Sequence, residues 1–340
     1  MPDAIPRHCL SFDVEEHFQV SAFETPMRRR HWGQFESRVE DNTERLLGLL
    51  ENRGVRATFF ILGWVAERYP SLVRRIASGG HEVASHGYAH ELITSQTPST
   101  FREDIRKAKG ILENILSQPM LGYRAPSFSI TKDTMWATQI LVEEGYVYDS
   151  SIFPVLHDRY GVPSANPEAH QLLTASGLLW EVPPSTVKCL GVRLPVAGGG
   201  YFRLYPYALL RALLRKLEAE GASLVMYMHP WEFDPDQPRM EGSLVSRMRH
   251  YLNLDKTEIR MRELLQDFSF APIREVFPQM CAAGFSGFGS VSAFSEKSIS
   301  GITQLISFSG QFTQTSLTLS CSRLDCSYLY RQNSNCANVQ

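Results

Sequence analysis

The sequence lacks long apolar runs and any excess of charge of one sign. Its 340 residues contain 34 Lys and Arg against 36 Asp and Glu, which gives a net charge of −2. This near-equality of positive and negative residues excludes the strongly basic surface by which many proteins bind nucleic acid. No stretch reaches the roughly 18 apolar residues of a membrane-spanning helix, and the first eight residues have no apolar core of a signal peptide. We therefore expect a cytoplasmic protein without a transmembrane segment.

Cysteine is also scarce, and its six positions do not form a metal-binding pattern. Four of them crowd the C-terminal end, where the sequence has no histidine and no pair spaced as Cys-x-x-Cys: Cys281, Cys321, Cys326 and Cys336. Structural zinc sites commonly use such pairs. Cys9 lies in an apolar, strand-like run and resembles a small core residue. We expect no zinc site built from cysteine.

Short apolar runs alternate with amphipathic stretches over about the first 275 residues. The runs predict strands at residues 7–13, 57–62, 82–85, 121–124, 146–149 and 223–228. The amphipathic stretches predict helices at residues 38–52, 63 to about 78, 101–116, 132–144 and 206–220. Such an alternation is typical of parallel strands covered by helices, in an open sheet or a barrel.

The composition changes near residue 277. Serine occupies 13 of the last 63 positions, and only five of those positions are charged. A stretch with so little apolar periodicity is typical of a poorly ordered or loosely attached segment; a small β appendage is the alternative. We therefore expect a catalytic domain at residues 1–276 and a serine-rich tail at residues 277–340.

Two pairs of polar residues come directly after predicted strands. Asp13 and Glu15 follow the first strand, and in extended backbone both point to the same side. Adjacent acids are costly unless a cation or a proton separates them, although a solvated acidic loop has the same pattern. His86 and His90 follow the third strand, four residues apart, so one helical turn would place both on one face. Two imidazoles and a carboxylate are a common ligand set for a catalytic divalent metal.

Three further polar residues also lie at the ends of predicted strands. Arg124 could hold a carboxylate in its ionised form, although an ordinary salt bridge has the same signature. Asp149 ends another strand, and His229 follows an apolar strand directly, which favours a catalytic acid. Because the carboxyl ends of parallel strands form the ligand face of such folds, the five clusters together predict a metal-assisted hydrolase.

In this order, the five segments resemble the NodB-like polysaccharide deacetylases, carbohydrate esterase family 4. The resemblance covers roughly residues 8–276 and implies a distorted (β/α) barrel with about seven parallel strands. Longer runs at residues 12–20, 198–203 and 229–232 are similar to the branch found with exopolysaccharide and exosortase gene clusters. The matching segments are Phe12-Asp13-Val14-Glu15, Ser85-His86 through His90, Arg124-Ala125-Pro126, Asp149-Ser150-Ser151 and the strand ending at His229.

The resemblance implies a metal site and a general base. Asp13 would be the base, and Glu15, His86 and His90 would bind the metal. Zinc is expected from the ligand types, with cobalt or nickel as alternatives. The family commonly has two adjacent aspartates where this chain has Asp-Val-Glu, so Glu16 is an alternative to Glu15 as the carboxylate ligand.

The resemblance also implies an acid and a substrate-binding wall. Arg124 would pair with Asp13, while Asp149 would orient His229, the general acid, and raise its pKa. The glycines at 198–200 would let the main chain approach a sugar closely, or would form a flexible turn. Three residues are expected to contact the substrate: Tyr201, Trp231 and Pro126.

The implied reaction is removal of N-acetyl groups from the amino sugars of a polysaccharide or of a lipid-linked oligosaccharide, in exopolysaccharide biosynthesis. An allantoinase-like hydrolase of another amide and a non-catalytic glycan-binding relative are the alternatives. Binding alone requires neither a base such as Asp13 nor an acid such as His229. A purely structural metal site is disfavoured because such sites normally close with four protein ligands.

Overall fold

A computed structural model describes residues 8–189 and 191–280 of the chain. The predicted tail from residue 281 onward, with the four terminal cysteines, lies outside the described residues. Nine strands form one sheet in the order β10-β1-β2-β3-β4-β5-β7-β6, with β11 paired to β1. Every pairing is parallel except β6 with β7. The strands are β1 (His8–Val14), β2 (Thr58–Ile61), β3 (Glu82–Ser85), β4 (Gly122–Tyr123), β5 (Tyr148–Asp149), β6 (His170–Thr174), β7 (Gly177–Glu181), β10 (Val225–Met228) and β11 (Phe270–Ala271).

The segment after β7 closes the gap between the two ends of the sheet. Ser185 donates its backbone N–H to the carbonyl of Val225 in β10 (3.1 Å), and its Oγ accepts the backbone N–H of Val225 (2.7 Å). A separate hairpin follows, made of β8 (Thr186–Cys189) and β9 (Val192–Pro195). The prediction of a mostly parallel α/β barrel is confirmed. The sheet has nine strands where about seven were expected, because the hairpin of β6 and β7 and the short β11 add to it.

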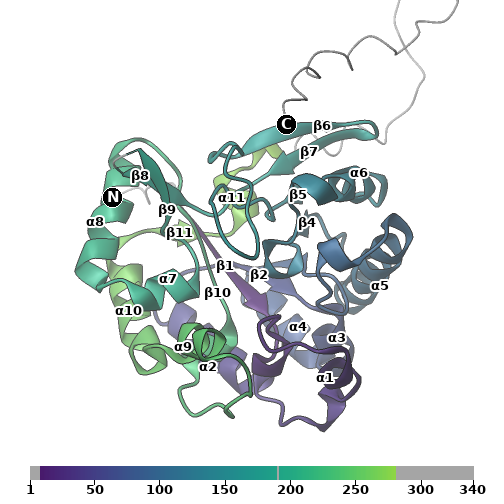
Figure 1. The fold of residues 1–340 in the computed structure, drawn as a ribbon, viewed down its shortest axis with the longest axis horizontal. Helices are drawn as coiled ribbons and strands as arrows, with labels where there is room; N and C mark the ends of the chain where they lie inside the picture. Colours follow the sequence, from purple (N-terminus) through teal and green to yellow (C-terminus); the bar gives the residue numbers. More distant parts are fainter. Residues whose placement is uncertain (1–7, 190, 281–340) are drawn as a thin grey trace, which may run out of the picture. The chain divides into compact units, whose positions relative to one another are not determined.

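Helices cover the outside of the strands (Figure 1). The longest is α5, which begins at Pro98, where the missing N–H costs nothing in the first turn. Its buried face consists of Phe101, Ile105, Ala108 and Leu112, as the helical spacing predicts. The helices are α1 (Pro26–Arg30), α2 (Val39–Glu51), α3 (Gly63–Arg68), α4 (Pro70–Ser78), α5 (Pro98–Leu116), α6 (Trp136–Glu143), α7 (Gly199–Leu204), α8 (Tyr207–Ala219), α9 (Leu244–Tyr251), α10 (Thr257–Asp267) and α11 (Ile273–Val276).

One expectation about the elements was wrong. The single helix predicted from residue 63 to about 78 is two helices, because Pro70 has no N–H to continue α3 and disfavours helical backbone at Tyr69. The hairpins β6–β7 and β8–β9 were not predicted. Near the end of the described residues, Ile273 and Met280 belong to one buried cluster, and Phe277 packs against it.

No helix in the described part of the chain is long and apolar enough to cross a membrane.

His81 directly precedes β3, at the end of the strand opposite to the site. Its Nδ1 accepts the backbone N–H of Ala57 (3.2 Å), and its ring packs on Phe59 at 4.9 Å between centroids. Burial, with the nearby charge of Arg56, lowers the pKa of His81 to about 4. The folded protein therefore holds this imidazole neutral.

A lowered histidine pKa makes stability depend on pH. His81 stabilises the fold fully above its unfolded pKa of about 6.5, and this contribution is lost as pH falls toward 4 because the unfolded chain takes up the proton. Between pH 7 and 4.5 we expect the free energy of unfolding to fall about 1–2 kcal/mol less in His81→Asn, which keeps an acceptor but cannot titrate. Urea unfolding at both pH values measures this difference. Equal pH dependence in the two proteins would contradict it.

Candidate active site

The polar residues singled out in the sequence gather at the carboxyl edge of the sheet. Asp13 is the second-last residue of β1, and this strand lies between β10 and β2. His86 follows β3, Arg124 follows β4 and His229 follows β10. Parallel pairing brings these strand ends to one edge, so residues more than 200 positions apart in the sequence become neighbours. His229 is the most open of them, with 19% of its side chain exposed.

Glu15, His86 and His90 form a buried group of metal-ligand type. One ligand atom of each lies within 4.8 Å of the others, and Glu15 Oε2 is 2.6 Å from His90 Nε2. The Nδ1 of His86 donates to the carbonyl of Arg124 (2.8 Å), which leaves its Nε2 free to bind a cation. Glu15 Oε2 is buried without a hydrogen-bond partner. His90 has a φ of 49°, a left-handed conformation that non-glycine residues adopt at a cost and often at functional sites.

The structure distinguishes the two glutamates that the sequence left open. Glu16 turns away from His86 and His90 and accepts hydrogen bonds from the hydroxyl of Ser37 and from the backbone N–H of Arg38 (3.1 Å). These contacts tie Glu16 to the residue that directly precedes α2. Glu15 is therefore the carboxylate of the metal-ligand group.

The ionisation of this group fits a divalent cation. Burial lowers the pKa of His86 to about 4, so its imidazole is neutral and keeps a lone pair. Burial alone would raise the pKa of Glu15, but its interactions with the adjacent imidazoles of His90 and His229 outweigh burial and hold the pKa well below its ordinary value. One carboxylate and two imidazoles, with no fourth protein ligand in the group among the described residues, match a catalytic metal site.

Arg124 holds Asp13 in place beside this group. The guanidinium is fully buried, and its Nη1 donates to Asp13 Oδ1 (2.7 Å) and to Ser11 Oγ (2.9 Å). Its Nε and Nη2 donate to the carbonyl and the hydroxyl of Ser150, at 3.1 and 2.9 Å. The carboxylate therefore has one oxygen fixed by Arg124 and the other, Oδ2, directed toward His229 at 3.9 Å.

His229 faces both acids across the site. Its Nε2 lies 3.7 Å from Glu15 Oε1 and 3.9 Å from Asp13 Oδ2, while its Nδ1 bonds to Glu232 Oε1 at 2.7 Å. Burial would lower the pKa of His229, but Glu15, Glu232 and Asp13 together raise it to about 9. The imidazole is thus protonated near neutral pH, with a proton available on Nε2.

The expected pairing of Asp149 with His229 was wrong. Asp149 accepts from the hydroxyl of Ser151 and lies opposite Glu181 in the register of β5 and β7. Burial and the neighbouring negative charge raise the pKa of Glu181, and burial also raises that of Asp149. The pairing of β7 with β5 thus places Asp149 beside Glu181 and not beside His229.

Glu232 takes the position next to His229, and Arg203 holds it there. Arg203 Nε donates to Glu232 Oε2 (2.8 Å), and its Nη1 donates to the carbonyls of His250 and Leu252 (2.8 and 2.7 Å). Both side chains are at most 1% exposed. A Cβ at Gly199 would lie 1.8 Å from Glu232 Oε2, so only glycine leaves room for this carboxylate.

Gly198 and Gly199 make room for neighbouring side chains. Gly198 has a φ of 96°, and a Cβ there would lie 2.5 Å from the ring of Tyr227. Together with Gly199, it lets α7 begin directly against the strand and the turn that carry His229. The sequence does indicate Glu232 as a possible partner of His229, because it lies three residues later in the short turn that begins at Pro230.

The three expected substrate-contacting residues lie in different environments. Trp231 is 5% exposed; its Nε1 donates to Glu15 Oε1 (3.1 Å) and its ring stacks on His229 (4.9 Å between centroids). Trp231 therefore packs against two residues of the site. Tyr201 is half-buried, with its hydroxyl 3.5 Å from that of Tyr160. Pro126 is buried at the start of a short turn after β4.

Comparison with known proteins places this arrangement in a class. Residues 26–146 match the family model of polysaccharide deacetylases, and residues 150–278 match a domain of unknown function, DUF3473. A putative polysaccharide deacetylase from Mycobacterium smegmatis has the same fold, with a TM-score of 0.54 and 21% identity over 83% of this chain and 93% of its own. Puue allantoinase shares the fold as well (TM-score 0.52, 14% identity, 83% of this chain and 92% of its own).

The fold is therefore an α/β barrel of the type seen in a putative polysaccharide deacetylase and in an allantoinase. Residues 26–146 of this barrel carry a polysaccharide deacetylase domain. A peptidoglycan-N-acetylglucosamine deacetylase of Bacillus cereus is 34% identical over 98 residues, 28% of this chain and 36% of that protein. A chitooligosaccharide deacetylase of a Bradyrhizobium species is 30% identical over 94 residues, 27% of this chain and 43% of that protein. The chain spans about a third of the length of the first of these curated relatives.

We expect His86→Ala to weaken binding of a divalent metal roughly 100-fold, because it removes one of three ligands. Metal content of the purified protein after dialysis against zinc measures the loss. His81→Asn serves as the matched control, since it changes a buried histidine at the opposite end of the same strand. A variant at position 86 that retains one metal per chain would remove His86 from the ligand set.

Proposed function

We propose that the protein is a metal-dependent hydrolase that removes N-acetyl groups from the amino sugars of a polysaccharide. The observation that carries the proposal is the placement of Asp13 and His229 beside the group formed by Glu15, His86 and His90, with His229 Nε2 3.9 Å from Asp13 Oδ2 and 3.7 Å from Glu15 Oε1. A base and a protonated acid next to a cation-binding group are the components of amide hydrolysis. The deacetylase names of the related proteins support the same reaction class.

Glu15, His86 and His90 would hold the cation, and we propose zinc, with cobalt or nickel as alternatives. A divalent cation bound there would polarise the acetyl carbonyl and lower the pKa of water. Asp13, held in place by the hydrogen bond from Arg124, accepts the proton of the attacking water. Hydroxide then adds to the carbonyl carbon, and the C–N bond breaks in the following step.

His229 completes the reaction as the general acid. Its Nε2 proton passes to the departing nitrogen, so that the products are acetate and a free amino sugar. Glu232 bonds to the opposite ring nitrogen and so fixes both the orientation of the ring and the position of the transferable proton. Tyr201, at the edge of the same region, is proposed to contact the sugar, and Pro126 to shape the wall near Arg124.

The polymer is proposed to be an N-acetylated exopolysaccharide or its lipid-linked precursor, on the resemblance of the runs at residues 12–20, 198–203 and 229–232 to that branch of the family. Acetate release from a panel of chitooligosaccharides, peptidoglycan fragments and N-acetylated exopolysaccharide tests the reaction. Allantoin belongs in the same panel. Hydrolysis of allantoin with no acetate from any glycan would replace the deacetylase proposal by the allantoinase-like alternative.

We expect Asp13→Asn to lower the rate of acetate release by a factor on the order of 10² to 10⁴, because the amide cannot accept the proton. Its metal content should equal that of the wild type, since Asp13 is outside the ligand group. Single-turnover acetate release and metal analysis are measured on the same preparation. Near-normal turnover in this variant would exclude Asp13 as the base.

We expect Glu232→Gln to reduce kcat roughly 10- to 100-fold with little change in KM, because the ring of His229 loses its charged partner but the sugar contacts remain. Glu220→Gln, at an exposed glutamate, is the matched control. Unfolding curves of both variants separate a catalytic effect from loss of fold. A normal kcat in Glu232→Gln would show that His229 needs no partner.

A further inference from the structure

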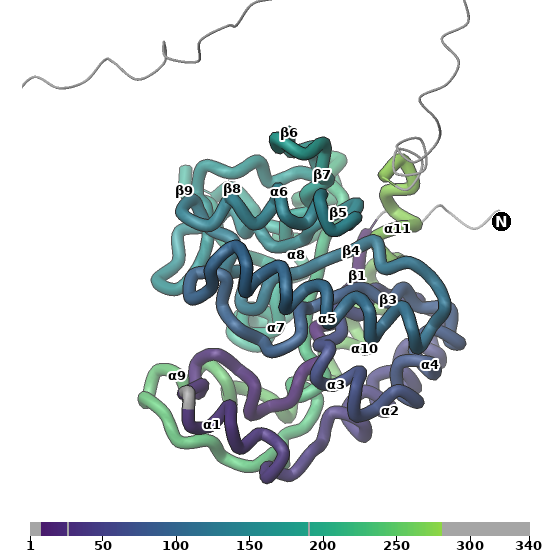
Figure 2. Tube along the Cα trace, turned by 90° about the vertical axis from the view of Figure 1, so that its right-hand side faces the viewer, coloured from purple at the N-terminus to yellow at the C-terminus, as the bar shows by residue number. Residues whose placement is uncertain are grey.

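Three segments at the carboxyl edge of the sheet form a continuous rim beside the site. They are α1, which follows β1, the loop of residues 154–163, which follows β5, and α9, which follows β10. Arg28 Nη1 donates to the carbonyl of Glu241, just before α9 (3.1 Å), and Arg249 of α9 pairs with Asp158 of the loop (3.3 Å). Figure 2 shows α1 and α9 at the same end of the molecule. We call this set of three segments the rim.

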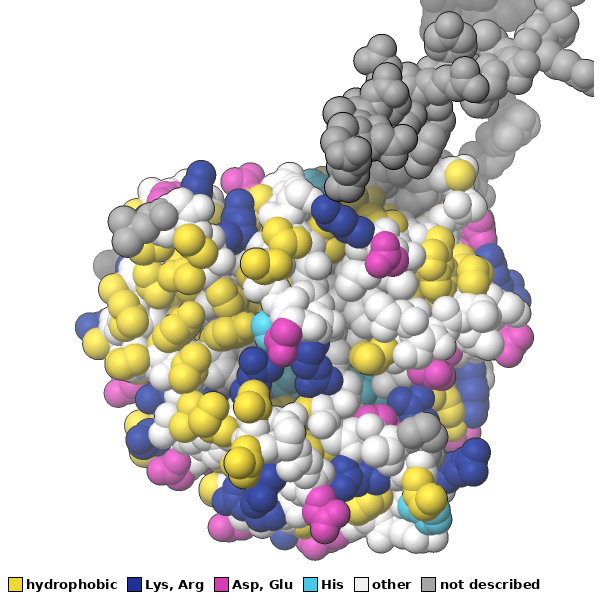
Figure 3. Space-filling view, in the orientation of Figure 1, with side chains coloured by type: hydrophobic (Ala, Val, Ile, Leu, Met, Phe, Trp, Pro, Cys, Tyr) yellow, Lys and Arg dark blue, Asp and Glu magenta, His cyan; other side chains and the backbone are white. Residues whose placement is uncertain are grey.

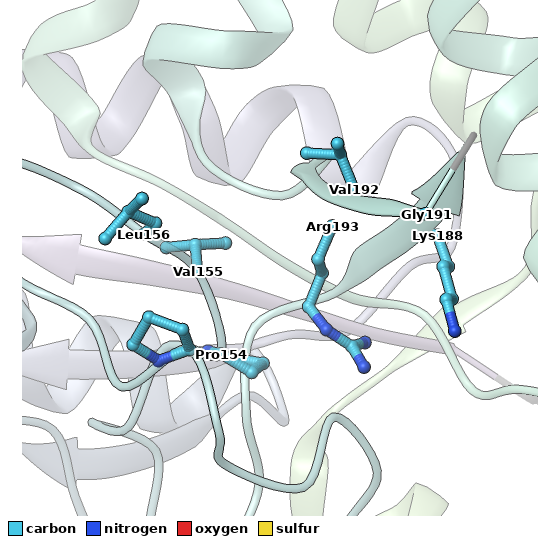
Figure 4. A pocket seen from close by; sticks show the side chains of 8 residues that line it. Pro154, Val155, Leu156, Lys188, Gly191, Val192 and Arg193 are labelled. Carbon is cyan, nitrogen blue, oxygen red and sulfur yellow. The ribbon is translucent and has the colours of Figure 1, made fainter.

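The rim exposes large apolar side chains on each of its segments. Leu156 is 88% exposed in the loop, Met27 71% in α1 and Leu244 81% in α9. Val245 and Met248 of α9 are also more than half exposed. Figure 4 shows Leu156 with Val155 and Val192 around a hollow of about 330 Å³ that extends the apolar surface toward the hairpin of β8 and β9. Five exposed apolar side chains on three adjoining segments are typical of an interaction surface.

The rim also carries unpaired positive charge. Three exposed arginines of the rim have no carboxylate within ion-pair distance in the described part of the chain: Arg30, Arg159 and Arg247. Figure 3 views the molecule from the side of Figure 1 and shows Lys and Arg side chains beside apolar ones around its centre, where histidine is visible. The three arginines are therefore available to an anionic ligand.

We propose that the rim docks on the surface of an anionic lipid bilayer. Exposed Leu, Val and Met would enter the boundary between headgroups and acyl chains, and the arginines would bind lipid phosphates. A bilayer suits this combination of side chains, because its headgroups present phosphates to the arginines and its acyl-chain boundary accepts the apolar side chains. Charge complementarity thus selects the bilayer as the occupant.

Docking in this orientation would turn the active site toward the headgroup layer. If the proposed deacetylation is correct, its substrate class would be a glycan attached to a lipid carrier, presented at the membrane surface. This consequence rests on the proposed function, but the docking itself does not. Binding to vesicles can therefore be measured without any turnover.

The test is co-flotation of the full chain with vesicles of phosphatidylcholine alone or with 40% phosphatidylglycerol, a composition of about the anionic content that such surfaces need. We expect binding to the anionic vesicles only. We also expect the affinity to fall about tenfold or more in the double variant Leu244→Ser/Val245→Ser and in Arg159→Ala/Arg247→Ala. Acetate release from a soluble oligosaccharide should be unchanged in both variants, which separates docking from catalysis.

Leu173→Ser is the matched control, because Leu173 is 83% exposed but lies beside the turn of the β6–β7 hairpin, at the amino end of β7. Its binding should equal that of the wild type. Equal binding to both vesicle types, an undiminished affinity in the rim variants, or the same loss in Leu173→Ser would each overturn the proposal. Failure of vesicle binding with normal acetate release would leave the proposed function standing and remove only the docking.

Discussion

The buried ion pair of Asp13 and Arg124 is the constraint around which the rest of the site is arranged. Both side chains are buried, and either charge alone would be costly in that environment. Arg124 is itself fixed by hydrogen bonds to Ser11 and Ser150. Residues from three strands therefore fix the position of the Asp13 carboxylate. The same residue's carbonyl accepts from His86 and thereby determines which imidazole nitrogen faces the cation. One residue thus positions the base and a ligand together.

A second buried ion pair, between Arg203 and Glu232, performs the corresponding task for the acid. It lies on the far side of the site, and its carboxylate bonds to His229 rather than to a metal ligand. Asp149, in the segment that resembles the fourth family motif, is instead paired with Glu181 behind Arg124. The partner of His229 therefore comes from the turn after β10 and not from β5. Gly199 makes this possible, because no larger residue would leave space for the carboxylate.

The two regions matched by separate family models build one barrel. Residues 26–146 supply β2, β3 and β4 with His86, His90 and Arg124. Residues 150–278 supply β10 with His229 and its supporting pair. Because β1 pairs with β10 on one side and with β2 on the other, strands of both regions belong to one sheet. The region matched by the domain of unknown function provides His229, the proposed general acid, together with Glu232 and Arg203.

The sequence by itself determined the parallel α/β architecture, since apolar runs and amphipathic helices alternate along it, and it located Asp13, Glu15, His86, His90, Arg124 and His229 because each lies at the end of such a run. It could not decide between Glu15 and Glu16, nor find the partner of His229. Those choices depend on which side chains share a face after strands distant in sequence have paired. The register of β5 with β7 removes Asp149 from the site, and the packing of α7 against the turn after β10 brings Arg203 and Glu232 to it. Local pattern fixes where a residue stands along its strand, whereas only tertiary packing decides which residue it meets.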